Sequence, residues 1–233
     1  MNISNFIEEL KKINICPTKR QLQQLEKYYE LLVEYNKVMN LTGITDKETV
    51  YLKHFYDSLT IAKVIDLNKE YTLCDIGTGA GFPGLVLKIM FPNLKITLVD
   101  CLNKRIQFLN NVIEELELNN IIPIHSRIED YGRFNKDIYD IVTARAVSSL
   151  NILLEYSIPL LKVGGYFIPM KGKLENEPDY KTALEKLNCK VEKCTTFKLP
   201  VENSDRNILL IKKINVTNKK YPRINSLIVK SPL

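Results

Sequence analysis

The densest cluster of residues suited to binding a small molecule lies at positions 75–84, which read Asp-Ile-Gly-Thr-Gly-Ala-Gly-Phe-Pro-Gly. An apolar stretch that predicts a buried strand precedes this cluster, and another that predicts a short helix follows it. Glycine adopts positive φ and lets the backbone approach a ligand closely, and the start of a helix presents free N–H groups. The order strand, glycine loop, helix therefore predicts a ligand-binding loop.

This glycine loop is compatible with two nucleotide cofactors, NAD and S-adenosylmethionine. Residues 79–84 match the dinucleotide pattern G-x-G-x-x-G, which taken alone favours NAD. Asp75, however, places a carboxylate at the start of the loop, where it would repel a pyrophosphate but suit the ammonium or sulfonium charge of S-adenosylmethionine. We therefore favour S-adenosylmethionine over a dinucleotide. A tight turn without a ligand explains the loop less well, because three glycines in five residues weaken a turn.

Further candidate residues stand at the ends of predicted strands. A parallel sheet binds its ligand beyond the carboxyl ends of its strands, and Asp100, Ile128, Glu129 and Arg145 all lie at such ends. Asp100 follows the glycine loop by about 20 residues, the spacing at which a carboxylate accepts ribose hydroxyls in either class of nucleotide site. We expect Ile128 and Glu129 to flank an adenine and Arg145 to hold a carboxylate or a phosphate. Surface ion pairs remain an alternative for Glu129 and Arg145.

The fourth predicted strand restricts the chemistry of a methyl acceptor. It ends in Thr143-Ala144-Arg145, without the cysteine nucleophile of pyrimidine C5 methylation and without the Asp/Asn-Pro-Pro-aromatic motif common in amine methylation. Guanine N7 already carries a nucleophilic lone pair and loses no proton, so its methylation needs only alignment of the reacting atoms. Arg145 and Lys171 are candidates for positioning such an acceptor through its phosphate or O6, and no directly catalytic residue is indicated.

Hydrophobic periodicity predicts the elements that position these residues. Capping-box patterns at residues 18–21 and 45–48 predict the starts of two amphipathic helices. The second helix should bury Leu52, Phe55, Leu59 and Ala62. Strands are predicted at residues 71–76, 95–100, 121–124, 139–145, 166–170, 191–199 and 207–214, with Gly164-Gly165 as the turn before the fifth. Helices are expected at residues 85–91, 103–116, 150–161 and 179–187.

Strands that alternate with helices predict an α/β fold. The last two strands follow one another without a helix, so they should pair antiparallel as a hairpin. We therefore expect a doubly wound, seven-stranded, Rossmann-like methyltransferase sheet with its last strand antiparallel. An N-terminal helical region at residues 1–67 should pack on a core at residues 68–214, and a C-terminal tail should follow at residues 215–233.

Composition limits the class of protein further. Of the 233 residues, 45% are hydrophobic, which is enough for a large core, but no apolar run approaches the ~20 residues of a membrane span. The N-terminus lacks the basic and apolar regions of a signal peptide, so we expect a cytoplasmic protein that does not contact membranes. Five cysteines form no C-x-x-C pair and only two histidines are present, which argues against a metal site.

Positive charge is concentrated near the C-terminus. Residues 206–233 hold seven of the 33 basic residues and none of the 27 acidic residues, so the rest of the chain carries 26 basic and 27 acidic residues. A basic terminal segment of this kind often contacts nucleic acid. A solvated tail that only aids solubility explains the charge equally well.

A series of short motifs, in order over nearly the whole chain, carries a family resemblance. The motifs are Tyr35-Asn36, Asn40-Leu41-Thr42, His54-Phe55-Tyr56-Asp57-Ser58, the glycine loop at 75–84, Asn103-Lys104-Arg105, Thr143-Ala144-Arg145-Ala146-Val147, Lys171-Gly172, Ser204-Asp205-Arg206-Asn207 and Lys220-Tyr221-Pro222-Arg223. Together they resemble the bacterial ribosomal RNA small subunit methyltransferase G family, also called glucose-inhibited division protein B.

This resemblance implies transfer of a methyl group from S-adenosylmethionine to N7 of a guanine in 16S ribosomal RNA of the small subunit. It places the family's cofactor contacts on Gly77, Phe82, Ile128, Glu129 and Arg145, and it implies no agreed general base. With the residues inferred above, the candidate cofactor-binding set is Asp75, Gly77, Gly79, Phe82, Asp100, Ile128, Glu129 and Arg145. We expect the protein to act as a monomer.

The tail departs from the family pattern that the resemblance implies. After Pro-Arg the family usually continues with Lys, Gly, Thr and Pro, whereas residues 224–229 here read Ile-Asn-Ser-Leu-Ile-Val. An apolar run at this place indicates packing on the body of the protein as an alternative to RNA contact. For the whole chain, the alternatives are an RNA-binding assembly factor with a nucleotide-binding fold and an NAD-dependent oxidoreductase.

Overall fold

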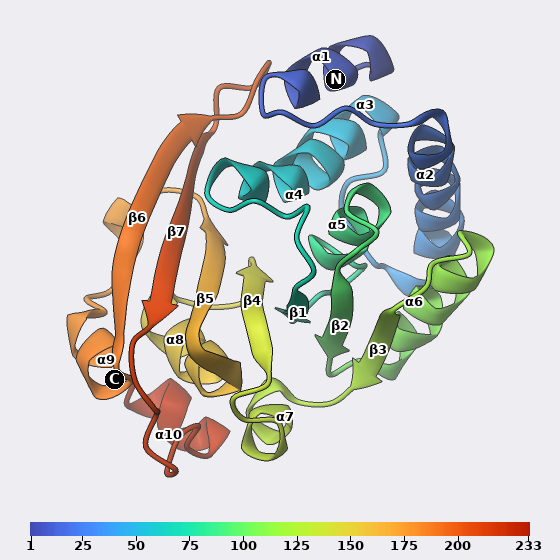
Figure 1. Ribbon diagram of the computed structural model, residues 1–233. Coiled ribbons are helices and arrows are strands. Elements are labelled where there is room, and N and C mark those ends of the chain that lie inside the picture. Colours follow the sequence, from blue (N-terminus) through green and yellow to red (C-terminus); the bar gives the residue numbers. More distant parts are fainter.

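A seven-stranded sheet forms the middle of the molecule (Figure 1). The computed structural model describes residues 1–233, with the side chain of Asn176 left out of the description. The strands are β1 (Thr72–Ile76), β2 (Lys95–Asp100), β3 (Ile121–His125), β4 (Tyr139–Arg145), β5 (Leu161–Lys171), β6 (Cys189–Lys198) and β7 (Asp205–Lys213). Their spatial order is β3-β2-β1-β4-β5-β7-β6, and β7 runs antiparallel to both of its neighbours. The predicted fold class is confirmed.

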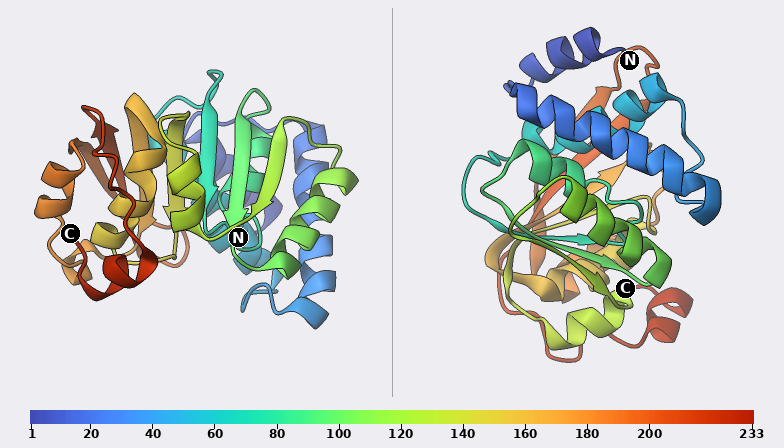
Figure 2. Two further views of the ribbon diagram at one scale, coloured as in Figure 1. Left: turned by 90° about the horizontal axis from the view of Figure 1, so that it is seen from below. Right: turned by 90° about the vertical axis from the view of Figure 1, so that its right-hand side faces the viewer.

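Helices cover both faces of the sheet, as Figure 2 shows. They are α1 (Ile3–Lys11), α2 (Lys19–Met39), α3 (Lys47–Val50), η1 (Tyr51–Tyr56), α4 (Asp57–Leu59), η2 (Thr60–Lys63), α5 (Gly84–Met90), α6 (Asn103–Glu115), α7 (Ile128–Phe134), α8 (Leu150–Ser157), η3 (Ile158–Leu160), η4 (Leu174–Asn176), α9 (Lys181–Lys186) and α10 (Asn225–Lys230). Among the described residues, no helix is both long and apolar enough to cross a membrane.

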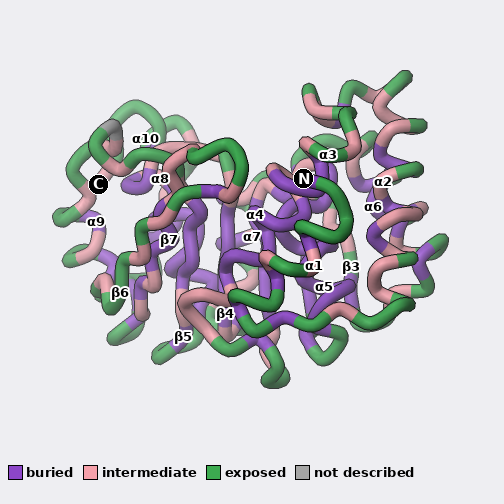
Figure 3. The backbone as a smooth tube through the Cα atoms, turned by 90° about the horizontal axis from the view of Figure 1, so that it is seen from above, coloured by how far each residue is buried: buried purple, intermediate pink, exposed green. Residues whose placement is uncertain are grey.

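Two apolar clusters fill the space on either side of the sheet. Side chains alternate between the faces of a strand, and along β7 Ile208 and Leu210 belong to one cluster while Leu209 and Ile211 belong to the other. The first cluster joins the sheet to α1, α2, α5 and α6, and the second joins it to α8, α9 and α10. The strands in the centre are accordingly buried along most of their length (Figure 3).

The predicted strands agree with the structure to different extents. The predicted ranges of β2 and β4 agree with the structure, whereas β5 begins at Leu161, so the prediction of a turn at Gly164-Gly165 is wrong. The glycines lie inside the strand because β5 shifts register against β4 at this point. A Cβ at Gly165 would stand 2.9 Å from the carbonyl oxygen of Asp140, so only glycine fits there.

The helices before the glycine loop confirm one predicted start and correct the other. Thr18 caps α2 by the predicted capping box with Gln21. The next helix begins one residue later than predicted, because Asp46 accepts the backbone N–H of Thr49 at 2.9 Å. This helix then widens into η1, a six-residue π-helix.

The end of this helical region differs from the predicted pattern of burial. A regular helix would bury Ala62 with Leu52, Phe55 and Leu59, but residues 60–63 form the tighter 3-10 helix η2, in which Ile61 is buried and Ala62 is partly exposed. Helices that the sequence did not predict are α1, α7, η4 and α10. The division of the chain into segments 1–67, 68–214 and 215–233 stays a prediction.

Candidate functional site

Two neighbouring cavities open beyond the carboxyl ends of the parallel strands. The first cavity, of about 400 Å³, is lined by residues that follow β1 to β4 together with two residues of α10; these include Gly77, Asp100, Arg105, Arg127, Ile128, Glu129, Val147, Tyr156, Asn225 and Val229. The second cavity, of about 420 Å³, is lined by Lys53, His54, Asp57, Arg145, Met170, Lys171, Glu177 and Arg206, among others. Ala146 lines both cavities, so the two spaces meet at this residue.

Ala146 itself has an unusual backbone conformation. Its φ is +55°, in the left-handed region that residues with a Cβ rarely adopt. Such a conformation costs about 1–2 kcal/mol and is concentrated at functional sites. The chain thus turns sharply after β4, and this turn directs Arg145 into the second cavity while Val147 lines the first.

The glycine loop approaches the first cavity along its backbone. Gly77 has φ +66°, and a Cβ there would stand 2.6 Å from Cγ2 of Val147. Gly79 has φ +61° and nothing within 4 Å of where its Cβ would be, so the loop presents open space at this point. A side chain at Gly79 would enter that space, which is the geometry expected of a backbone cradle for a ligand.

Asp75 lies beneath the glycine loop and holds it together. The side chain is fully buried, and its Oδ2 accepts the Thr78 hydroxyl at 2.7 Å and the Gly84 N–H at 2.8 Å. Its Oδ1 is buried and has no hydrogen-bond partner among the described residues. Burial raises the pKa of Asp75 to about 7, against the lowering effect of these two hydrogen bonds. Asp75 lines neither cavity, so its carboxylate acts on the shape of the loop, and its predicted contact with a cofactor stays a prediction.

Asp100 is the carboxylate of the first cavity. Its Oδ2 accepts the backbone N–H of Gly79 at 2.9 Å, and its Oδ1 accepts that of Leu102 at 2.9 Å. Arg105 pairs with Oδ2 at 3.1 Å, and the Asp100 side chain is nearly fully buried. The predicted spacing from the glycine loop therefore produces a direct contact between Asp100 and that loop.

Ile128 and Glu129 stand at the start of α7, as residues of the first cavity. Glu129 is buried, and Arg127 donates to its Oε1 at 2.6 Å from the exposed side. Together with Gly77 and Asp100, these two residues are the predicted cofactor contacts that the structure brings to one cavity. Asp75, Gly79 and Phe82 do not appear in its lining, although Gly79 touches Asp100.

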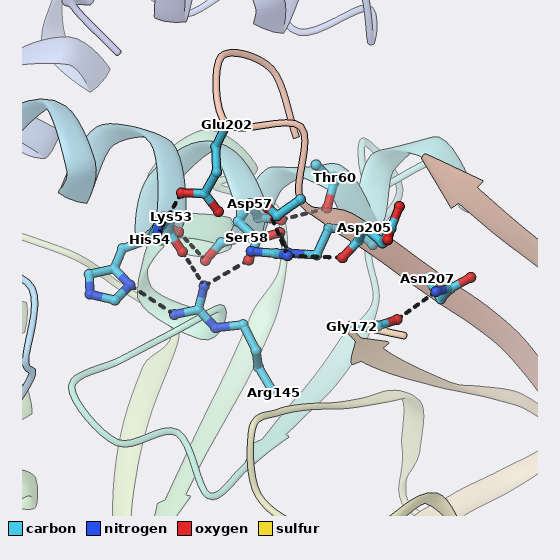
Figure 4. A network of polar contacts seen from close by, with 12 residues as sticks. Lys53, His54, Asp57, Ser58, Thr60, Arg145, Gly172, Glu202, Asp205 and Asn207 are labelled. Atoms are coloured by element: carbon cyan, nitrogen blue, oxygen red, sulfur yellow. Dashed lines mark hydrogen bonds and ion pairs between the residues drawn. The ribbon is translucent and has the colours of Figure 1, made fainter. Parts of the chain in front are cut away.

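Arg145 and Lys171 belong to the second cavity. Figure 4 shows the Arg145 guanidinium directed toward the helix that carries Lys53, His54 and Asp57. Arg145 donates to the carbonyl oxygen of Lys53 at 2.8 Å and to Nδ1 of His54 at 3.3 Å. Lys171 donates to the carbonyl oxygen of Ser148 at 2.6 Å and pairs with Glu177 at 2.7 Å. The structure therefore does not bring Arg145 together with Gly77 and Asp100.

Phe82 is buried between aromatic rings, and the guanidinium of Arg145 lies over the face of its ring. The ring of His54 stacks on Phe82, and Tyr28 stacks near it with centroids 5.5 Å apart. Arg145 lies over the Phe82 ring at 5.1 Å from its centroid. Phe82 thus connects the glycine loop to the second cavity, and its predicted role in cofactor binding stays a prediction.

Asp57 joins two arginines at the second cavity. It is buried, with Oδ1 3.0 Å from Nε of Arg206 and Oδ2 3.5 Å from Nη1 of Arg145. Burial raises the pKa of Asp57 even though both guanidinium groups oppose this shift. Burial likewise lowers the pKa of Arg145, against the attraction of Asp57 and Asp75. This network fixes the direction of the Arg145 side chain.

The two cavities differ in charge. The first is lined by two carboxylates, those of Asp100 and Glu129, and by two guanidinium groups, those of Arg105 and Arg127, so its charges balance. The second is lined by four cationic residues and two carboxylates. These residues are Lys53, Arg145, Lys171 and Arg206 against Asp57 and Glu177. An excess of positive charge suits a phosphate-bearing ligand in the second cavity.

The sequence did not predict five ionisable residues of the second cavity as site residues: Lys53, His54, Asp57, Glu177 and Arg206. Three of them lie in motifs that carried the family resemblance, at residues 54–58 and 204–207, and those motifs were the available signal. For metal binding, no group of three or more His, Cys, Asp or Glu side chains gathers among the residues that the structure describes.

Both the sequence and the fold are similar to those of known proteins. The family model described as rRNA small subunit methyltransferase G matches residues 21–209. A protein named Ribosomal RNA small subunit methyltransferase G from Bacillus thuringiensis (strain Al Hakam) is 52% identical over 227 residues, which cover 96% of this chain and 95% of the relative. A relative of the same name from Bacillus anthracis (strain A0248) has the same identity and coverage.

Solved structures similar to this chain share its fold. A single-residue variant of the 16S rRNA (adenine(1408)-N(1))-methyltransferase from Catenulisporales acidiphilia, with cosubstrate SAM, matches with a TM-score of 0.52 and 16% identity, over 65% of this chain and 88% of that one. A SAM dependent methyltransferase from Aquifex aeolicus matches with a TM-score of 0.51 and 17% identity, over 72% of this chain and 94% of that one.

Proposed function

Because the chain belongs to the rRNA small subunit methyltransferase G family, we propose that it methylates N7 of a guanine in 16S ribosomal RNA, using S-adenosylmethionine. The observation that carries the proposal is the pair of cavities that meet at Ala146. One cavity has the glycine loop and a carboxylate of a nucleotide site, and the other has the positive charge of a phosphate site. A methyl donor and an RNA nucleotide placed in them would face each other across one residue.

The first cavity fits S-adenosylmethionine. Gly77 of the glycine loop lines this cavity, and the Asp100 carboxylate stands beside the loop, where it accepts the N–H of Gly79. We propose that Asp100 accepts the ribose hydroxyls, that Ile128 and Glu129 flank the adenine, and that Gly77 and Gly79 wrap the methionine portion. Asp75 would act beneath the loop by holding Thr78 and Gly84. The bound cofactor supplies an electrophilic methyl group on a positively charged sulfur.

The second cavity fits a nucleotide of the acceptor. We propose that Lys171 and Arg145 position the acceptor, with Arg206 adding positive charge at the same wall. Arg145 is already oriented by Lys53, His54 and Asp57, so little side-chain freedom would be lost on binding. A preoriented cation beside the reacting base acts by alignment and charge, without taking a proton.

The ionisable groups of the second cavity are poorly placed to serve as a general base. The carboxylates of Asp57 and Glu177 are both ion-paired, and both ring nitrogens of His54 are hydrogen-bonded. Guanine N7 has a free lone pair and loses no proton on methylation, so it does not need a base. This chemistry supports N7 over an exocyclic amine as the acceptor atom.

The function is tested by locating the transferred methyl group. Protein and S-adenosylmethionine carrying a labelled methyl group are incubated with naked 16S RNA or with assembled small subunits, and the label is mapped by nucleotide and by atom. The proposal expects label at N7 of one guanine, and label at an exocyclic amine or on protein would contradict it. A separate titration with NADH tests the oxidoreductase alternative, for which binding would be expected. That the protein acts as a monomer in the cytoplasm stays a prediction.

A further inference from the structure

The C-terminal segment, residues 215–233, packs on the body of the protein instead of extending away from it. Tyr221 and Ile228 are buried against the cluster that contains α8. Arg223 forms a bidentate pair with Glu155, with Nε 2.8 Å from Oε1 and Nη2 2.7 Å from Oε2. Glu155 has no exposed surface, so the pair holds the segment firmly to α8.

The same segment also contacts α7. Pro222 lies against Gly132, where a Cβ would stand 3.3 Å from Cγ of Pro222. Lys136, just past the end of α7, donates to the carbonyl oxygen of Lys219 at 2.8 Å. Since Ile128 and Glu129 begin α7, the segment supports the element that carries two predicted adenine contacts.

Helix α10, at the end of this segment, reaches the first cavity. Asn225 and Val229 line the cavity together with Asp100, Ile128 and Glu129. The hydroxyl of Tyr156, another residue of the lining, donates to Oδ1 of Asn225 at 2.6 Å. Ile228, between Asn225 and Val229 in the sequence, is buried and fixes the helix on the body of the protein. Val229 is left at the rim of the cavity, with 54% of its surface exposed.

From this arrangement we propose that α10 is a wall of the cofactor site and that Val229 and Asn225 contact bound S-adenosylmethionine. The inference rests on the proposed function, because it takes the first cavity as the cofactor site. It assigns a role to residues beyond 209, where the match to the family model ends. The apolar run at 224–229, which departs from the expected tail, is then explained by burial of Ile228 and by the apolar surface that Val229 offers to the ligand.

The inference is tested by calorimetric titration of the full chain with S-adenosylmethionine. Val229→Trp places a bulky ring at the cavity rim and is expected to weaken binding at least tenfold. Val216→Trp is the matched control, because Val216 is another exposed valine of the C-terminal segment and does not line the cavity. The control is expected to bind within twofold of the unmodified protein. The midpoint of thermal unfolding, measured for each variant, reports whether it is folded.

A second variant keeps the test informative if the tryptophan disturbs folding. Val229→Ser removes apolar contact without adding bulk and is expected to weaken binding about threefold in the same titration. If both Val229 variants bind as the unmodified protein does, the inference is wrong while the proposed function stands. Equal weakening by Val216→Trp would also overturn it, since the effect would not depend on the cavity. Failure of the unmodified protein to bind S-adenosylmethionine would overturn the proposed function and the inference with it.

Discussion

The imidazole of His54 stacks on the ring of Phe82, with centroids 4.4 Å apart and planes inclined by 17°. Arg145 donates to Nδ1 of this imidazole, and an arginine can only donate, so Nδ1 is an acceptor and the proton is on Nε2. Nε2 in turn donates to the hydroxyl of Thr42 at 2.9 Å. His54 is therefore held neutral in one tautomer, between the glycine loop and the arginine network.

Acid should destabilise the protein through His54. Burial, followed by the charge of Arg145, lowers the pKa of His54 from 6.5 to about 4. Between these values the unfolded state binds more protons than the folded state, so the free energy of unfolding falls as the pH drops through this window. When the pH falls from 7 to 5, the free energy of unfolding should decrease in the unmodified protein by about 1–2 kcal/mol more than in His54→Gln, which lacks the titrating imidazole. Urea unfolding of both proteins at several pH values measures the difference, and parallel pH profiles would contradict the expectation.

A side chain added in the glycine loop should weaken cofactor binding strongly. Gly79→Val adds a side chain in the open space beside Asp100, so S-adenosylmethionine affinity should fall by at least a hundredfold in a calorimetric titration. Gly164→Val is the matched control, because Gly164 also has positive φ (+86°) and open space around its Cβ position but lies in β5, away from both cavities. Both variants should lose similar stability, about 1–2 kcal/mol, from the left-handed backbone. Equal affinities for the two variants would show that the cradle lies elsewhere.

Asp100→Asn should weaken S-adenosylmethionine binding by about 1–3 kcal/mol, because it removes a charged acceptor for the ribose hydroxyls. The shape of the side chain is kept, and one oxygen can still accept from Gly79. Asp140→Asn is the control, since Asp140 also pairs with a basic residue and accepts a backbone N–H, but does not line either cavity. The measurement is the dissociation constant, and a loss in the control as large as in Asp100→Asn would mean that only general destabilisation is observed.

The lysines of the C-terminal segment should contribute to RNA binding through their charge. Lys219, Lys220 and Lys230 are exposed, whereas the segment's Arg223 is already paired. For single-stranded RNA, the slope of log affinity against log salt should become shallower by about 0.7 for each phosphate that the protein no longer neutralises. A Lys219→Ala/Lys220→Ala variant should therefore show a shallower slope, and Lys181→Ala/Lys186→Ala on α9 provides the comparison. Identical slopes in all three proteins would leave the segment without a role in RNA binding.

Methyl transfer itself should depend little on pH. His54 stays neutral above pH 6 because of its lowered pKa, and N7 methylation removes no proton. Single-turnover rates at saturating cofactor should vary less than threefold between pH 6 and pH 9. Nε2 of His125 lies 3.0 Å from the carbonyl oxygen of Cys101, which lines the first cavity, so His125→Ala, like Glu129→Gln, should change cofactor affinity more than this rate. A steep rise with pH that disappears in one of these variants would indicate a general base and argue against N7.

Local sequence predicted the first cavity better than the second. Gly77, Asp100, Ile128 and Glu129 meet because each follows a parallel strand, and the ends of parallel strands share one edge of the sheet. The second cavity joins Asp57 to Arg206, which are 149 residues apart, and no periodicity or spacing encodes such a contact. The position of α10 was equally unpredictable, because a six-residue helix has little periodicity of its own and is held by Glu155 and the buried Ile228.

The π-helix η1 has a consequence for how this protein tolerates changes in chain length. It places the carbonyl oxygen of Lys53 and the ring of His54 toward Arg145, although π-helical winding is less favourable than α-helical winding. A π-helical turn holds about one residue more than an α-helical turn, so deleting one residue between Tyr51 and Tyr56 would let the segment relax to an ordinary α-helix while the turns before and after it kept their places. The residues inside the segment would move relative to Arg145, and the contacts of Lys53 and His54 with its guanidinium would be lost. Local helix stability and the contacts to Arg145 therefore require different winding of the same six residues.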